Sequence, residues 1–129
     1  MPPSPSKPKS KARIDAYLGG HRGEALAAWF LRLQFYRVVA QRYKTPVGEI
    51  DLIVERFGTT VFVEVKARRK ASSEAETLAA INQSRIVRAA QYWLAKNPAK
   101  AQTSLRFDVI FLARRRWPRH VVNAFDASP

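Results

Sequence analysis

Residues 48–67 read GEIDLIVERFGTTVFVEVKA and decide how this part of the chain folds. The segment holds two runs rich in β-branched residues, EIDLIVE at 49–55 and TTVFVEVKA at 59–67, and such residues favour strands. Only the short segment RFGT at 56–59 lies around their junction, which is typical of a tight turn. We therefore predict an antiparallel hairpin.

The register of this hairpin follows if its turn is centred between Phe57 and Gly58. Side chains along a strand alternate between the two faces of a sheet. One face of the hairpin then carries only aliphatic side chains, with Ile50, Leu52 and Val54 opposite Val61, Val63 and Val65. We expect this face to be core, and its burial fixes the register because a slip of one residue would turn it outward.

The other face is chemically unusual, since the same register pairs Asp51 with Glu64 and Glu49 with Lys66. Two facing carboxylates repel each other. Four of the ten acidic residues fall within 49–64, although the chain as a whole is strongly basic. Lys66 can compensate part of this charge, and a hard divalent cation with oxygen ligands compensates it better. The alternative is a solvated polar face with ordinary cross-strand ion pairs.

The composition narrows the class of partner. The 129 residues include 23 lysine and arginine against 10 aspartate and glutamate, a formal net charge of +13. Such a charge attracts phosphate backbones largely without regard to base sequence, so nucleic acid is the leading partner. The chain has no cysteine, which excludes disulfides and thiolate zinc sites. No stretch approaches the ~18 consecutive apolar residues of a membrane span, and the first residues lack the apolar core of a signal peptide, so we expect a cytoplasmic protein without a membrane partner.

The length suits one compact domain, which we place at residues 14–129 after a disordered basic arm at 1–13. The arm is rich in proline and cationic side chains and has almost nothing apolar, so burial cannot offset the entropy of ordering it. It could contact phosphates, but an unstructured solubilising tail explains it as well.

Apolar periodicity and turn residues predict the remaining elements. These are helices at about 22–35 and 75–96, strands at 36–42 and 105–113, and a turn at 45–48. Ser73 and Glu76 have the spacing of a capping box at the start of the second helix, and Asn97-Pro98 stops it. The basic tail from Arg114 onward has no firm assignment.

The order of the motifs carries a family resemblance. GEIDLI at 48–53 followed by VFVEVKAR at 61–68 resembles the Asp and Glu-x-Lys motif of the PD-(D/E)XK nucleases, with Ile50 in place of the proline in the motif's name. The larger set adds Gly23-Glu24 at the start of a helix and RFDV at 106–109. This set is similar to the uncharacterised bacterial YraN-like family and, more distantly, to the archaeal Holliday junction resolvases.

The resemblance covers about residues 19–113 and implies an α/β, restriction endonuclease-like fold, a central mixed β-sheet flanked by α-helices. It implies that Asp51 and Glu64 bind Mg²⁺ or Mn²⁺, that Lys66 orients or activates the attacking water, and that Glu24 is an additional acidic ligand. The expected activity is metal-dependent cleavage of DNA, more than RNA, possibly branched or structured DNA, and the resolvase likeness suggests a homodimer. The alternative is a non-catalytic nucleic-acid-binding or adaptor module on the same scaffold.

Several residues are weaker candidates for contacts with nucleic acid. Gln83 could face the site from the second helix, where relatives would carry a basic or amide residue, although a polar residue at a helix boundary explains it equally well. Arg68, Arg69 and Lys70 directly follow the Glu-x-Lys strand and could guide a phosphate backbone, as could the cluster at 114–116. A solvated loop is the alternative for both clusters.

Asp108 and the two histidines are interpreted as outside the site. Asp108 shares a strand face with Arg106, so we favour a structural role in which it satisfies a buried arginine. His21 and His120 lack the spaced partners of a zinc site, and we interpret both as incidental.

Overall fold

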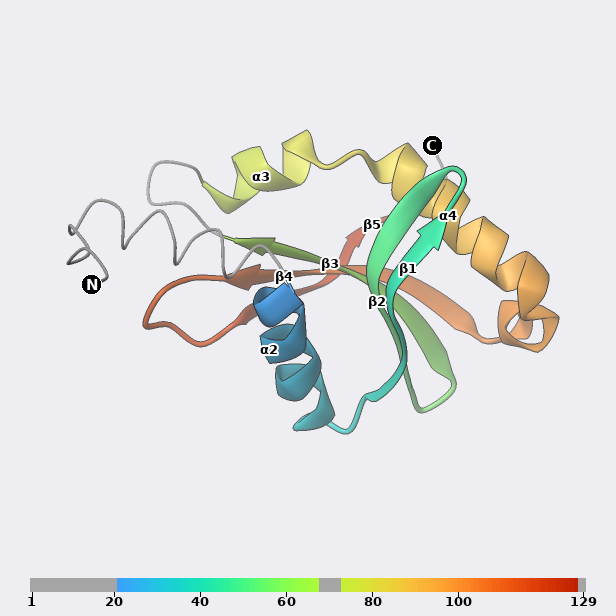
Figure 1. The fold of residues 1–129 in the computed structure, drawn as a ribbon, viewed down its shortest axis with the longest axis horizontal. Helices are drawn as coiled ribbons and strands as arrows, with labels where there is room; N and C mark the ends of the chain where they lie inside the picture. Colours follow the sequence, from blue (N-terminus) through green and yellow to red (C-terminus); the bar gives the residue numbers. More distant parts are fainter. Residues whose placement is uncertain (1–20, 68–72, 128–129) are drawn as a thin grey trace, which may run out of the picture.

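The computed structural model describes residues 21–67 and 73–127, and in this part of the chain five strands form one mixed sheet (Figure 1). The strands follow one another in space as in sequence: β1 (Arg37–Thr45), β2 (Gly48–Arg56), β3 (Thr59–Ala67), β4 (Ser104–Leu112) and β5 (Arg119–Phe125). Neighbouring strands are antiparallel except for β3 and β4, which are parallel. The expected mixed sheet flanked by helices is therefore confirmed at the level of its architecture.

Helices cover both faces of the sheet, with α2 on one side and α3 and α4 on the other (Figure 1). The helices are α2 (His21–Arg32), α3 (Glu74–Ala80), α4 (Gln83–Lys96) and the short 3₁₀ helix η1 (Pro98–Gln102). Among the described residues, no helix is both long and apolar enough to cross a membrane. The predicted arm at 1–13 and the cluster Arg68, Arg69 and Lys70 lie outside the described residues.

The predicted hairpin is confirmed, and its register is confirmed as far as Leu52, whereas the predicted pairs Asp51–Glu64 and Glu49–Lys66 are not part of the ladder. The ladder between β2 and β3 runs from Arg56 opposite Thr59 to Leu52 opposite Val63. Phe57 and Gly58 form the turn with φ of 49° and 77°, the pair of positive angles that a type I′ turn requires.

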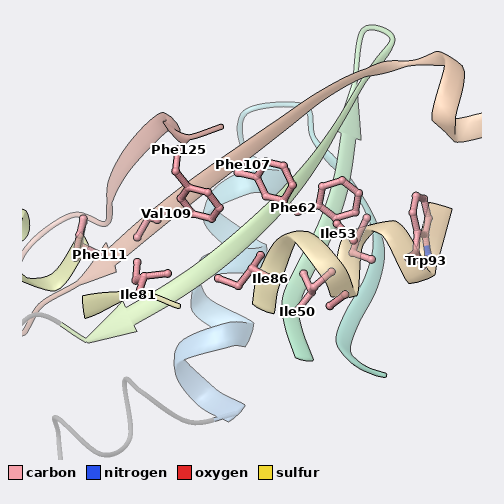
Figure 2. Close-up of a cluster of buried hydrophobic side chains, with 12 residues drawn as sticks. Ile50, Ile53, Phe62, Ile81, Ile86, Trp93, Phe107, Val109, Phe111 and Phe125 are labelled. Atoms are coloured by element: carbon pink, nitrogen blue, oxygen red, sulfur yellow. The ribbon is translucent and has the colours of Figure 1, made fainter. Parts of the chain in front are cut away.

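Two hydrophobic clusters hold the helices on the sheet. The first lies under α2 and contains the alternating aliphatic side chains that the register predicted, Leu52, Val54, Val61, Val63 and Val65, with Ala27, Ala28 and Leu31 of the helix. The second lies under α4 and includes a row of aromatic rings (Figure 2). The ring centroid of Phe107 lies 5.3 Å from that of Phe62 and 5.1 Å from that of Phe125. The prediction for Ile50 was wrong, because it packs in the second cluster, as Figure 2 shows.

The prediction of one helix at 75–96 was also wrong, because the chain forms two helices with a break at Ile81 and Asn82. Ile81 is extended, with φ −69° and ψ 131°, and its side chain is buried in the second cluster. Asn82 then starts α4 as its N-cap by accepting a hydrogen bond from the backbone N–H of Arg85 at 3.2 Å. The predicted cap is confirmed, since the Ser73 hydroxyl accepts from the N–H of Glu76.

Helix α2 ends three residues earlier than predicted. The N–H of Tyr36 bonds to the carbonyl of Leu31, and that of Phe35 bonds to Arg32, which is the pattern of a Schellman motif. Phe35 occupies the left-handed position of this motif, with φ of 69°. The turn directs the chain into β1, so Tyr36 returns to the first cluster.

Asp108 fastens the outer strand β5, which the sequence left unassigned. Its fully buried carboxylate accepts hydrogen bonds from Arg106 and from the backbone N–H of Asn123, and lies 2.6 Å from Nε2 of His120. Burial alone would raise the pKa of Asp108, but the hydrogen bonds from His120, Arg106 and Asn123 hold it below its usual value. The expected structural pairing with Arg106 is confirmed, whereas the interpretation of His120 as incidental was wrong.

Candidate functional site

The candidate site begins where β2 and β3 separate. Their ladder stops at Leu52 and Val63, although the same register would continue with Asp51 opposite Glu64 and then Ile50 opposite Val65. The backbone N–H of Val65 donates instead to Oδ2 of Asp51 at 2.8 Å. The carboxylate thus replaces a backbone acceptor, and the opening between the strands leaves room for acidic side chains from both.

Four carboxylates gather at this opening. Carboxylate oxygens of Glu24, Glu49 and Asp51 all lie within 4.8 Å of one another. Glu64 of β3 interacts with Asp51 from the other strand, as the register predicted. The structure therefore brings the predicted residues Glu24, Asp51 and Glu64 together. It adds Glu49, which sequence reasoning paired only with Lys66, although its position two residues before Asp51 was a signal.

Glu24 reaches the group because of its place on α2. It lies in the first turn of the helix, on the side that Ala27, Ala28 and Leu31 bury against the sheet. The residue is only 8% exposed. Burial, followed by the charge of Asp51, raises the pKa of Glu24 to about 7, although Arg42 acts in the opposite direction.

The pKa of Glu64, on the neighbouring strand β3, is raised for the same reasons. Burial is again the largest cause, and the nearby Asp51 adds to it, so the pKa of Glu64 rises to about 8. The ammonium of Lys66 lies 3.6 Å from Oε1 of Glu64 and opposes this rise. Lys66 is partly exposed and can therefore meet a molecule that approaches from solvent.

Arg42 of β1 is the group's main cation apart from Lys66. Its Nε lies 3.5 Å from Glu24 and 3.6 Å from Glu49. Neither Nε of Arg42 nor Oε2 of Glu24 has a hydrogen-bond partner, although both atoms are buried. Arg42 also has a φ of 50°, which is uncommon for a residue with a side chain. The guanidinium of Arg42 is therefore close to Glu24 and Glu49, but its Nε makes no hydrogen bond to either carboxylate.

A pocket of about 370 Å³ opens beside these acids, toward the start of α4. Its polar lining is Glu49, Glu64, Lys66, Asn82 and Arg85. Gln83, the predicted site-facing residue, is the exposed first residue of α4, and its neighbours line the pocket instead. Arg85 donates from Nε to the carbonyl of Val47 at 3.3 Å, which holds its cationic side chain over the end of the β1–β2 turn.

Further positive charge lies at the same end of the sheet. Because β3 and β4 are parallel and Ala67 is opposite Leu112, the two strands end at the same end of the sheet. Arg114, Arg115 and Arg116 follow β4 there and are exposed.

Comparison with known proteins places the chain in a family. Over 126 residues it is 45% identical to a UPF0102 protein of Rhodopseudomonas palustris strain BisB5, covering 98% of this chain and 96% of the relative. A UPF0102 protein of Chelativorans sp. strain BNC1 is 48% identical over 116 residues, covering 90% of this chain and 94% of the relative. The family model matches residues 23–112, which include all four carboxylates and Lys66. The chain belongs to the uncharacterised protein family UPF0102, and this confirms the likeness to the YraN-like proteins.

Proposed function

We propose that this protein is a divalent-metal-dependent endonuclease of the PD-(D/E)XK type that acts on DNA. One observation carries the proposal: a basic chain of charge +13 gathers four carboxylates from α2, β2 and β3 in one partly buried group. Placing so many acids together is unfavourable unless a cation joins them. Burial and, after it, the charge of Asp51 raise the pKa of both Glu24 and Glu64.

The residues fit a hard divalent cation. Mg²⁺ and Mn²⁺ prefer oxygen ligands, and Glu24, Glu49, Asp51 and Glu64 offer only carboxylate oxygens. Oε2 of Glu24 is buried and makes no hydrogen bond, and its ion-pair partner is Nε of Arg42 at 3.5 Å, with which a bound ion would compete. A bound ion would supply activation of water and neutralisation of the charge that grows on a phosphoryl group.

The other residues of the site have separate tasks under this proposal. The backbone N–H of Val65 holds Asp51 in place by donating to its Oδ2. The other oxygen of this carboxylate, Oδ1, is not used by that hydrogen bond. Lys66, which the PD-(D/E)XK resemblance assigns to the attacking water, lies beside Glu64 and borders the pocket. Arg85 borders the same pocket and can neutralise a phosphate.

A second candidate is a nucleic-acid-binding or adaptor module without catalysis. The observation that favours it is Arg42, which already brings a positive charge to within 3.6 Å of Glu24 and Glu49. A chain that has its own counter-cation has less need of a metal ion. The two candidates differ in whether a divalent ion binds and in whether DNA is cut.

The test is cleavage of duplex, single-stranded, flap and four-way DNA with Mg²⁺ or Mn²⁺, for wild type and for Lys66→Ala. We expect metal-dependent cleavage by wild type and a loss of at least ~100-fold in the variant, because general acid–base assistance typically contributes that much. DNA binding should persist, since one of 23 cationic residues adds little to the overall attraction. Lys96→Ala, a change of an exposed lysine in the last turn of α4, is the matched control and should cut like wild type.

Wild type that binds no divalent ion and cuts no substrate would overturn the enzyme proposal and leave the binding module. Cleavage at equal rates by wild type and Lys66→Ala would place the chemistry elsewhere. Isothermal titration with Mn²⁺ distinguishes a chain without a metal site from one that binds metal but lacks the right substrate.

A further inference from the structure

Two phenylalanines are exposed at positions where a large apolar residue is unexpected. Phe35 is 80% exposed and Phe57 is 86% exposed. Each has a positive φ, 69° for Phe35 in the Schellman motif after α2 and 49° for Phe57 in the β2–β3 turn. Glycine or asparagine usually occupies both kinds of position. Neither local backbone geometry nor core packing therefore explains the two rings.

The two rings line one pocket. It has a volume of about 330 Å³ and includes Arg37, Arg56 and Lys100 in its lining. It lies at the turn of the hairpin, five residues along β2 from Asp51, so the two sites are separated by about 17 Å of strand. A Cβ placed on Gly58 would meet no atom within 4 Å, which shows that the turn is open to solvent.

The pocket also has a surplus of positive charge that is held in place. The guanidinium of Arg56 lies 4.1 Å from the ring centroid of Tyr36 and 5.4 Å from that of Phe57, and it donates to the carbonyl of Gln34 at 3.0 Å. Arg37 and Lys100 both pair with Glu55. The lining residues therefore include three cations and one carboxylate, and Arg56 is the cation that does not pair with that carboxylate.

We propose that Phe35, Phe57 and these cations form a binding site for unpaired nucleobases, separate from the acidic site. Aromatic faces stack on any base, and neighbouring cations hold the phosphates of the same strand. Bases inside a duplex are already stacked on each other and cannot reach the rings. The proposal rests on the nucleic-acid part of the proposed function and not on hydrolysis. The proposal implies a substrate with an unpaired segment. That segment lies a few nucleotides from the part of the substrate that is bound at the acidic site.

The fold offers variants that remove the rings without removing favourable backbone interactions. Phe35→Gly and Phe57→Asn place preferred residues in the Schellman motif and the type I′ turn, so thermal stability should be kept or increased. Leu33→Ala is the control, because Leu33 is an exposed apolar residue two positions from Phe35 and does not line the pocket. Fluorescence anisotropy would measure the affinity of each protein for single-stranded DNA, duplex DNA and an abasic single strand.

We expect the double variant to bind single-stranded DNA at least about tenfold more weakly than wild type, because each stacked base contributes substantially to affinity. Its affinity for duplex DNA, and that of Leu33→Ala for both, should change by less than about twofold. Wild type should bind the abasic strand about as weakly as the double variant binds the ordinary strand. This last comparison changes the ligand and leaves the protein intact.

Unchanged single-strand affinity in the double variant, with duplex binding present, would overturn the stacking site and leave the proposed function standing. A change in sedimentation of the double variant without a change in affinity would assign the rings to a protein interface, which also overturns the site. Wild type that binds no nucleic acid at low salt would overturn both proposals.

Discussion

At the scale of single residues, Arg42 reduces the repulsion between the clustered carboxylates. This residue brings its guanidinium between Glu24 and Glu49 while its own backbone has a φ of 50°. A left-handed conformation costs about 1–2 kcal/mol for a residue with a Cβ, so the placement needs compensation. Attraction to the buried Glu24 and the exposed Glu49 compensates for it, and this makes Arg42 a competitor of any divalent ion for the same charge.

Arg42→Gln should therefore increase the dependence of stability on a divalent ion. Without metal, the variant should melt at a lower temperature than wild type, because the carboxylates lose their nearest counter-charge. The rise in melting temperature on adding Mn²⁺ should be larger than in wild type, since the ion then meets a less neutralised site. Scanning fluorimetry with EDTA and with Mn²⁺ measures both effects.

Arg37→Gln is the control, because Arg37 is exposed and pairs with Glu55 away from the acids. It should respond to Mn²⁺ as wild type does. An equal response of Arg42→Gln and wild type would mean that Arg42 and the metal do not share a site.

Sequence reasoning found some site residues and missed others for identifiable reasons. Asp51 and Glu64 followed from the hairpin register, which depends only on local alternation and a short turn. Glu24 entered through the family likeness, because no local pattern tells how far a helix lies from a strand. Arg42 was missed because its role depends on β1 pairing with β2 and on an unusual φ. His120 was misjudged because its partner Asp108 lies across a strand pair that the sequence did not predict.

At the scale of elements, the separation of β2 and β3 creates the site. The N–H of Val65 would donate to a backbone carbonyl in a regular ladder, but it donates to Asp51. This places a carboxylate between the strands and keeps a buried donor satisfied. Asp51 therefore both accepts a structural hydrogen bond and places its carboxyl group beside Glu24 and Glu64, and substitutions can separate the two roles.

Asp51→Asn and Asp51→Ala should differ in stability but not in metal binding. Asparagine keeps an oxygen that can accept from Val65, whereas alanine leaves that N–H unsatisfied, at an extra cost of about 1–3 kcal/mol. Both variants lose the charged ligand and should bind Mn²⁺ much more weakly than wild type. Urea denaturation measures the first effect, and calorimetric titration measures the second. Full Mn²⁺ affinity in Asp51→Asn would exclude Asp51 as a ligand.

The elements that were predicted correctly are those whose signals are local. The hairpin and the Ser73 cap needed only neighbouring residues. The break at Ile81 was missed because the apolar spacing continues through it, and only the burial of Ile81 in the second cluster makes an extended residue favourable. Strand β5 was missed because its pairing depends on the buried Asp108, a contact distant in sequence.

At the scale of the whole molecule, charge is distributed unevenly. The chain has a net charge of +13, yet four of its ten acids form one group. The remaining surface is therefore more basic than the average suggests. Arg114, Arg115 and Arg116 are exposed directly after β4, and Arg37, Arg56 and Lys100 line the pocket at the hairpin turn.

Affinity for duplex DNA should consequently fall steeply with salt. Release of counterions makes the logarithm of affinity fall linearly with the logarithm of salt concentration, at a slope of about −0.9 for each phosphate contact. Four phosphate contacts would weaken binding by about two orders of magnitude between about 50 and 200 mM salt. Anisotropy titrations over this range test the expectation. A flat response would mean that the positive charge serves another purpose.

The pH dependence of stability has a definite sign. The pKa of Glu24 rises from 4.5 to about 7 and that of Glu64 from 4.5 to about 8 in the folded chain. Between pH 4.5 and these raised pKa values, the folded state retains protons that the unfolded state has released. The free energy of unfolding should therefore decrease as pH rises from about 4.5 to about 8, until both carboxyls are ionised in the folded state as well.

A divalent ion should reverse this trend, because it binds the ionised carboxylates and its affinity increases as they lose protons. We expect the melting temperature in EDTA to fall by several degrees between about pH 5 and pH 8, and the stabilisation by Mn²⁺ to grow over the same window. In the double variant Glu24→Gln, Glu64→Gln, both the fall in melting temperature and the growth of the Mn²⁺ stabilisation should become small. This result would assign both effects to these two carboxyl groups and not to other titrating residues. A stabilisation by Mn²⁺ that is equal at both pH values, or that survives in the double variant, would mean that the ion binds elsewhere and that the acidic group is stabilised by Arg42 and Lys66 alone.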